Sequence, residues 1–116
     1  MLEINRLEKN SRRSRAVVHG NTVYLGGQVG TDLDGDIKTQ TQQALEQVDR
    51  LLTAAGSERK KVLSVTIWLK TMDDYEDMNA VWDEWIDGDE PPARCCGKVD
   101  MADPRIRFEI TVAAAI

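Results

Sequence analysis

The sequence has very few residues of the types that hold metals or form disulfide scaffolds. Its 116 residues include two cysteines, which are adjacent, and one histidine, His19. Adjacent cysteines cannot link distant parts of a chain, and with a single histidine they provide too few ligands for a usual zinc site. These scarcities argue against a disulfide-stabilised scaffold and against a structural metal centre.

Long apolar runs and an excess of positive charge are also missing. No apolar run approaches the length that crosses a bilayer, and the first 15 residues lack the apolar stretch of a secretory signal. A cytoplasmic protein without a membrane partner is therefore expected. The 15 basic residues are outnumbered by 20 acidic ones, for a net charge of -5. This balance opposes a phosphate backbone, so no nucleic-acid partner is expected.

What the sequence does contain is typical of one globular domain covering residues 1–116. Hydrophobic residues make up 41% of the chain and charged residues 30%, which is close to the average for globular proteins. Valine-rich runs at 16–19 and 22–28 are separated by a Gly-Asn dipeptide, which predicts an opening β-hairpin. Gly26 and Gly27 interrupt the second run and indicate a β-bulge or a close approach of a ligand to the backbone.

The middle of the chain predicts two helices on either side of a strand. Apolar residues recur at helical spacing from Thr39, and Gly56 follows the expected helix end. Residues 61–70 alternate, with Leu63, Val65, Ile67 and Leu69 on the face assigned to the core. A second helix is expected at 73–86, with an apolar face of Tyr75, Met78, Trp82, Trp85 and Ile86.

The last quarter of the chain predicts two further strands, at 93–99 and 105–115. The element order β-β-α-β-α-β-β predicts an α+β fold with a single mixed β-sheet and two helices packed on one face. Trp68 lies on the strand face opposite the assigned core. We therefore expect the second sheet face to be covered as well, by another subunit.

The motif with the most chemical content is PPARCCGKVD, residues 91–100. Strand alternation places Arg94 and Cys96 on one face and Cys95 on the other. A guanidinium is matched to a carboxylate, and Glu109 also points away from the apolar face of its strand. Glu109 could therefore meet Arg94 across strands or across a subunit boundary. A purely structural ion pair between them is the simpler interpretation.

Cys96 has two interpretations. A neighbouring cation favours the thiolate, which is the setting of a nucleophile. The only histidine lies in the opening hairpin with no assigned partner, however, and a small cysteine is commonly a packing residue. Covalent catalysis by Cys96 is therefore the less favoured alternative.

Four segments of the chain together resemble the YjgF/Rid family of reactive-intermediate, or enamine/imine, deaminases. They are SRAVVHGNTVYLGGQVG, TQQALEQVDRLLTAAGS, VTIWLKTMDDYEDMNAVWDEW and PPARCCGKVDMADPRIRFEITVAAA. The resemblance covers nearly the whole chain from Ser14, and its most specific element is Pro-Ala-Arg-x-Cys followed by a strand that contains a glutamate. It implies a chorismate-mutase-like homotrimer with ligand clefts between subunits.

The resemblance also implies an activity and a set of roles. Members with the arginine hydrolyse 2-aminoacrylate and related 2-imino acids to a 2-oxo acid and ammonia, without a cofactor. Arg94 matches the residue that binds the carboxylate and Glu109 the residue that positions water, while Gly27, Asn79 and Cys96 match cleft residues. The sequence departs from the best-known members at three places, which leaves the substrate range open: Val17 replaces a tyrosine, Gly26 a serine, and Gly97-Lys98 an apolar-acidic pair.

Two other functions are compatible with the sequence. The first is a trimeric module that binds 2-oxo acids or other small carboxylates and regulates a partner without catalysis, for which Arg94 alone would suffice. The second is RNA cleavage, which the acidic charge balance and the single histidine disfavour. Imine deamination, with Arg94 and Glu109 as its principal residues, is the leading hypothesis.

Overall fold

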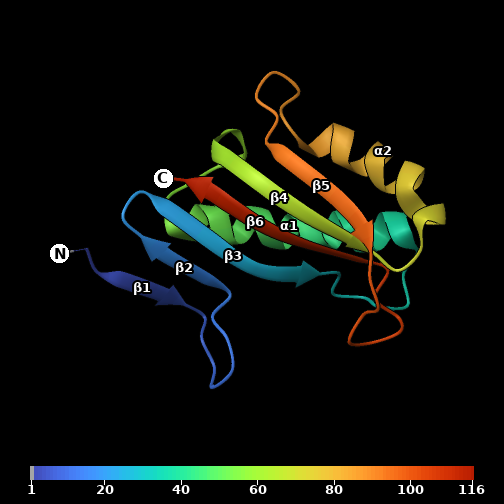
Figure 1. Ribbon diagram of the computed structural model, residues 1–116, viewed down its shortest axis with the longest axis horizontal. Coiled ribbons are helices and arrows are strands. Elements are labelled where there is room, and N and C mark those ends of the chain that lie inside the picture. The colour runs from blue at the N-terminus through green and yellow to red at the C-terminus, as the bar shows by residue number, and fades with distance from the viewer. Residues whose placement is uncertain (1) are drawn as a thin grey trace.

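The computed structural model describes residues 2–116, which form one six-stranded sheet and two α-helices (Figure 1). The strands are β1 (Ile4–Leu7), β2 (Ala16–His19), β3 (Thr22–Val29), β4 (Val62–Leu69), β5 (Ala93–Lys98) and β6 (Phe108–Ala115). The helices are α1 (Ile37–Ala55) and α2 (Tyr75–Trp85), and short 3₁₀ turns at Arg59–Lys61 and Met72–Asp74 precede β4 and α2.

The sheet has the strand order β1-β2-β3-β6-β4-β5. Its neighbouring strands are antiparallel except for β4 and β5, which are parallel, so the sheet is mixed as predicted. The chain has one more strand than expected, because β1 pairs with β2 at the sheet edge. Three of the four β1 residues are exposed, so this strand carries no alternation of apolar and polar residues by which the sequence could reveal it.

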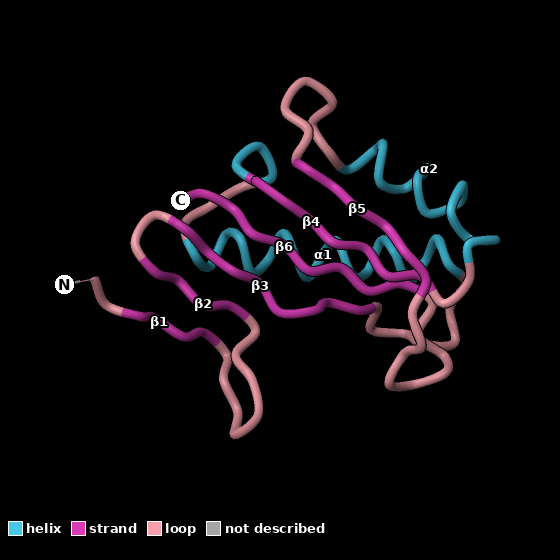
Figure 2. Tube along the Cα trace, in the orientation of Figure 1, coloured by secondary structure: helices cyan, strands magenta, loops and turns pink. Residues whose placement is uncertain are grey.

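The two helices lie on one side of the sheet, because apolar residues of α1, α2 and the strands form one shared core. Figure 2 shows α1 behind the strands and no element in front of them. In Figure 1, α1 crosses behind the strands and α2 lies beside β5. Apolar side chains between these layers form one continuous core. It includes Ala16, Val23, Leu25, Leu45, Val48, Leu51, Leu52, Val65, Ile67, Leu69, Met78, Trp82, Trp85, Phe108, Ile110, Val112 and Ala114. We call the uncovered side of the sheet the open face.

Both helices begin at different residues from those expected. Helix α1 begins at Ile37 rather than at Thr39, because the Asp36 carboxylate accepts a hydrogen bond from the Thr39 backbone N–H at 2.8 Å and caps the helix. Its end at Gly56 is confirmed, with φ at 84°, a left-handed conformation that favours glycine. The 3₁₀ turn before α2 begins after Thr71, whose hydroxyl accepts from the Asp73 N–H.

Two strand irregularities alter the predicted pattern. The register of β3 shifts between Leu25 and Gln28, which confirms a bulge at the glycine pair. A second shift in β4 lies between Val62 and Ser64. As a result Val62 is buried and Leu63 is exposed, so the assignment of Leu63 to the core was wrong.

The approach to β6 is fixed by one buried amide rather than by strand pairing. The predicted strand began at residue 105, but the strand itself begins at Phe108. Gln40 of α1 is fully buried, and its Oε1 accepts a hydrogen bond from the Arg107 N–H at 2.8 Å. Its Nε2 donates to the carbonyl oxygens of Leu33, Gly35 and Arg105 at 3.0 to 3.1 Å. The Gln40 side chain thus connects the loop before α1 to the loop before β6.

An ion pair links the start of β6 to the start of α2. The Arg107 guanidinium donates to both carboxylate oxygens of Asp74, at 2.7 and 3.1 Å. Asp74 is only 5% exposed, while Arg107 remains partly open to solvent. A buried carboxylate needs a charged partner, so this ion pair holds the start of α2 against the start of β6.

Candidate functional site

Strand β5 carries Arg94 on the helix-covered side of the sheet. In the parallel register, Arg94 lies opposite Val65 and Cys96 lies opposite Ile67, both of which are core residues. Cys95 lies opposite Thr66 and is exposed on the open face. The predicted separation of the two cysteines onto opposite faces is therefore present in the structure.

The Arg94 guanidinium is held by α2. Its Nη1 donates to the Asn79 Oδ1 at 2.9 Å, and its Nη2 donates to the Tyr75 hydroxyl at 3.3 Å. The guanidinium carbon lies 5.3 Å from the centroid of the Trp82 ring, which is within cation–π range. Arg94 is therefore oriented by three side chains of one helix, and it is the centre of the first half of the candidate site.

Cys96 shares the face of Arg94 and packs against the edge of the core. Burial raises the pKa of its thiol, and the nearby Arg94 charge only partly offsets that rise. A nucleophilic cysteine needs a lowered pKa. This environment supports the packing interpretation of Cys96 over covalent catalysis.

Glu109 forms the second half of the candidate site, on the open face. It lies opposite Trp68 in the register of β4 and β6, and both are at least partly exposed. A side chain at Gly27 would collide with the Glu109 carboxylate, whose Oε2 lies directly over the glycine. The bulge glycine therefore makes room for this carboxylate, and the backbone of Gly27 and Glu109 form one surface.

Arg94 and Glu109 do not meet within one chain. Among residues 2–116 no salt bridge joins them, and their strand registers place them on opposite sides of the sheet. The predicted contact across strands of one chain was therefore wrong, and a contact across a subunit boundary stays a prediction. The cause of the separation is the position of α2, which covers the Arg94 side of β5 and converts it into an inner face.

The open face also explains one departure from the family pattern. The Trp68 ring lies across Gly97, with its Cζ3 atom 3.2 Å from the position that a Cβ at Gly97 would take. A larger residue would displace the indole ring. Gly97 thus leaves room for the Trp68 ring, and Trp68 lies between Gly97 and Glu109 in the strand register. Val17 and Tyr24 continue the same face on β2 and β3.

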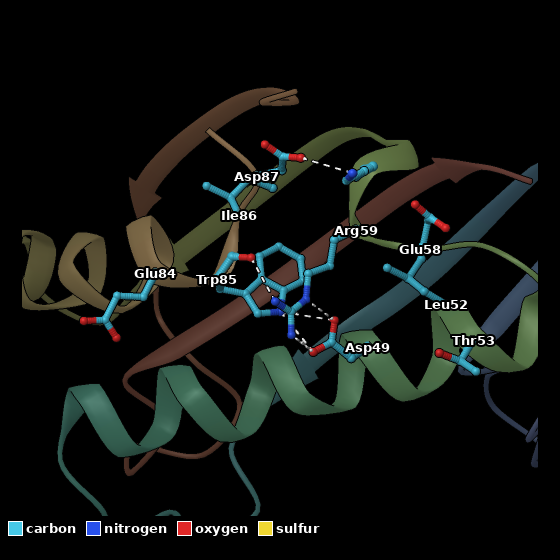
Figure 3. A pocket seen from close by; sticks show the side chains of 10 residues that line it. Asp49, Leu52, Thr53, Glu58, Arg59, Glu84, Trp85, Ile86 and Asp87 are labelled. Atoms are coloured by element: carbon cyan, nitrogen blue, oxygen red, sulfur yellow. Dashed lines mark hydrogen bonds and ion pairs between the residues drawn. The ribbon is translucent and has the colours of Figure 1, made fainter. Parts of the chain in front are cut away.

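A large surface hollow lies elsewhere, between α1, the turn before β4 and the end of α2 (Figure 3). It has a volume of about 670 Å³, and neither Arg94 nor Glu109 lines it. The charged side chains that line the hollow pair with each other. Arg59 donates to both Asp49 carboxylate oxygens at 2.8 and 2.9 Å and stacks on the Trp85 ring. The Trp85 indole N–H also donates to Asp49. We interpret this cluster as a clamp between the two helices.

Within residues 2–116, no group of three or more histidine, cysteine, aspartate or glutamate side chains is placed to hold a metal ion. No helix in the same range is both long and apolar enough to span a bilayer.

Sequence analysis missed two residues around Arg94. Tyr75 and Trp82 were assigned only to the apolar face of the second helix, yet both contact the guanidinium. Their spacing from Asn79, four residues before and three residues after, places all three on one side of a helix. That spacing was the available signal, but nothing in the sequence showed that β5 would present Arg94 to this side.

Comparisons with known proteins bear on the family and the fold of this chain. The family model described as Endoribonuclease L-PSP matches residues 3–116, so the match also includes β1. RutC family protein YoaB of Escherichia coli K12 is 35% identical over 99% of this chain and 100% of its own. The crystal structure of NMB1025 from Neisseria meningitidis, a member of the YjgF protein family, has a TM-score of 0.94 at 35% identity, covering 97% of this chain and 94% of that one. A crystal structure from Pseudomonas aeruginosa has a TM-score of 0.95 at 49% identity, covering 97% and 98%. The chain therefore belongs to the YjgF/RutC family.

Proposed function

We propose that this protein is a hydrolytic deaminase that converts 2-aminoacrylate and related 2-imino acids into 2-oxo acids and ammonia. The observation that carries the proposal is the Arg94 guanidinium, which α2 orients while part of its donor set stays unused. A guanidinium with unused N–H groups is suited to bind a planar carboxylate at two points. Every 2-imino acid carries such a carboxylate next to its reactive carbon.

We further propose that the protein works as a homotrimer with sites between subunits. Two features support an association through the open face. That face is not covered by any element of residues 2–116, and it carries large apolar side chains, with Tyr24 53% exposed. It also holds Glu109, which a chain cannot bring to its own Arg94. Association with a second copy supplies the missing half of the site and at the same time covers the exposed apolar surface.

The reaction then needs only positioning and one acid/base group. Arg94 binds the substrate carboxylate and exposes the imine carbon to the Glu109 of a neighbouring copy. The Glu109 carboxylate accepts a proton from water as the water oxygen bonds to the carbon of the protonated imine, which forms a carbinolamine. The protonated glutamate returns this proton to the nitrogen, the C–N bond breaks, and the carbinolamine hydroxyl gives its proton to the carboxylate, so that ammonia leaves and a 2-oxo acid remains. The released ammonia takes that proton from the glutamate and departs as ammonium.

The proposal is tested by trapping the imine. An amino acid oxidase generates 2-iminobutanoate in place, and semicarbazide captures whatever is not hydrolysed. We expect the wild-type protein to suppress the captured product, and Arg94→Ala to lower kcat/KM by about 100-fold through loss of a charged hydrogen-bond partner. The matched control is Arg59→Ala, which removes the other arginine stacked on a tryptophan at 5.3 Å and leaves Arg94 untouched.

The outcomes separate deamination from binding alone. Equal suppression by wild type and Arg94→Ala would contradict the role of Arg94. No suppression by wild type at enzyme concentrations comparable to the oxidase would contradict deamination of this substrate. Calorimetric binding of 2-oxobutanoate that is lost in Arg94→Ala would then favour the non-catalytic carboxylate module. A monomer mass in light scattering would contradict the trimer and the shared site.

A further inference from the structure

The face of α2 that meets Arg94 contains a tyrosine hydroxyl for which the proposed mechanism has no role. Tyr75 and Asn79 are four residues apart and therefore lie on the same side of the helix, and both accept hydrogen bonds from the guanidinium. The ring of Tyr75 packs against the edge of the core and the residue is partly buried. Packing alone would be satisfied by phenylalanine, so the hydroxyl needs a separate explanation.

The contacts of the guanidinium show what the hydroxyl does. An arginine has five N–H donors, and Arg94 uses one at Nη1 and one at Nη2 within the chain. Trp82 covers one face of the planar group. Stacking on a ring permits the guanidinium to rotate in its own plane, whereas two acceptors on one helix fix that rotation. Asn79 and Tyr75 together therefore determine the direction in which the remaining donors point.

The hydroxyl also has a proton to give. In the hydrogen bond with Arg94, the Tyr75 oxygen acts as the acceptor. Within residues 2–116 no protein group accepts the Tyr75 hydroxyl proton, and the residue is not fully buried. A carboxylate bound to the free N–H groups of Arg94 would provide oxygen atoms that accept a hydrogen bond from the phenol O–H.

We infer that the Tyr75 hydroxyl has two roles: it orients Arg94, and it donates a hydrogen bond to the substrate carboxylate that Arg94 binds. This inference rests on the proposed function, and it adds the phenol as a further hydrogen-bond donor to the carboxylate that the guanidinium binds at two points. It assigns substrate binding, rather than the hydrolytic step, to the hydroxyl. Asn79 shares the first task, because its carbonyl oxygen faces Arg94.

The test replaces the phenol by a phenyl ring in Tyr75→Phe. The core packing of the ring is retained, so the fold should be preserved. We expect the KM for 2-iminobutanoate and the Kd for 2-oxobutanoate each to rise about five- to tenfold, as for the loss of one hydrogen bond to a charged group, with kcat unchanged within about twofold. The control is Tyr24→Phe, which makes the same chemical change on the open face, roughly 13 Å along β6 from Glu109.

A second measurement needs neither turnover nor ligand. The ¹⁵N spectrum of the Arg94 Nη groups reports how fast the guanidinium rotates, and we expect that rotation to be faster in Tyr75→Phe than in wild type or Tyr24→Phe. An unchanged KM and Kd, or an unchanged rotation rate, would overturn the inference. If wild type shows no turnover, the deaminase proposal fails, and the rotation rate and the Kd still decide the role of Tyr75.

Discussion

The placement of Arg94 and Glu109 on opposite sides of one sheet can be tested by mixing two inactive chains. Arg94→Ala lacks the carboxylate-binding half of the site, and Glu109→Gln lacks the half that positions water. Each variant alone should be nearly inactive, with about 1% of wild-type kcat/KM expected for Arg94→Ala. Chains that are unfolded and refolded together, or co-expressed with different tags, form mixed assemblies in which an intact Arg94 can face an intact Glu109.

The recovered activity follows from counting. In an equal, random mixture, about half of the chains carry an intact Arg94 and about half of their neighbours carry an intact Glu109. If each site uses one residue from each of two chains, about one quarter of the sites are complete. If each site were built within one chain, no site would be complete and no activity would return.

A second mixture provides the control. Wild-type chains mixed equally with the double variant Arg94→Ala/Glu109→Gln retain about one quarter of wild-type activity for sites between chains, but about half for sites within a chain. Both mixtures are assayed by suppression of semicarbazide-trapped imine at the same total protein concentration. Absence of recovery in the first mixture, together with about half of the activity in the second, would refute a site shared between subunits.

Three further predictions follow from single contacts. Gly27→Ala should lower kcat by about 100-fold in steady-state kinetics, because its methyl group would displace the Glu109 carboxylate proposed to activate water. The control is Gly26→Ala, whose Cβ would lie 3.3 Å from its nearest atom, a backbone oxygen, and whose kcat should stay within a few-fold of wild type. Arg107→Ala should lower the free energy of unfolding by about 2 kcal/mol in denaturant titrations, because it leaves a buried carboxylate unpaired. Arg105→Ala, which removes only exposed ion pairs with Asp34 and Asp103, should lower it much less, and equal losses would contradict the argument. Alkylation of Cys96 by iodoacetamide, followed by mass spectrometry, should accelerate only above the pH at which an ordinary thiol ionises, because burial raises its pKa; rapid labelling at neutral pH would contradict this.

Sequence patterns were sufficient for the elements whose burial alternates. The final strand is an example, since Phe108, Ile110, Val112 and Ala114 are all buried as predicted. The patterns failed where a local event breaks the alternation. The bulge in β4 turned Leu63 outward, and β1 has no apolar alternation at all. Such events depend on pairing partners elsewhere in the chain, which a local pattern does not contain.

In the candidate site, too, the sequence pattern predicted which residues share a face of β5 but not which face the helices cover. Alternation correctly separated Cys95 from Cys96, because that separation needs only the geometry of one strand. It could not determine which side of β5 would be covered, because the strand contains no run of large apolar residues. That choice is made by α2, which packs on the Arg94 side and brings Tyr75 and Trp82 with it. The residues around the guanidinium therefore required the tertiary structure.

The buried amide of Gln40 has a consequence for how this chain can vary. One side chain reaches three carbonyl oxygens and one N–H, which belong to two loops that are far apart in the sequence. A residue inserted into either loop would move its carbonyl oxygens away from the amide and leave a polar group unsatisfied in the interior. The lengths of the loop before α1 and the loop before β6 are therefore linked. Insertions should be accepted at the chain's other turns before they are accepted at these two.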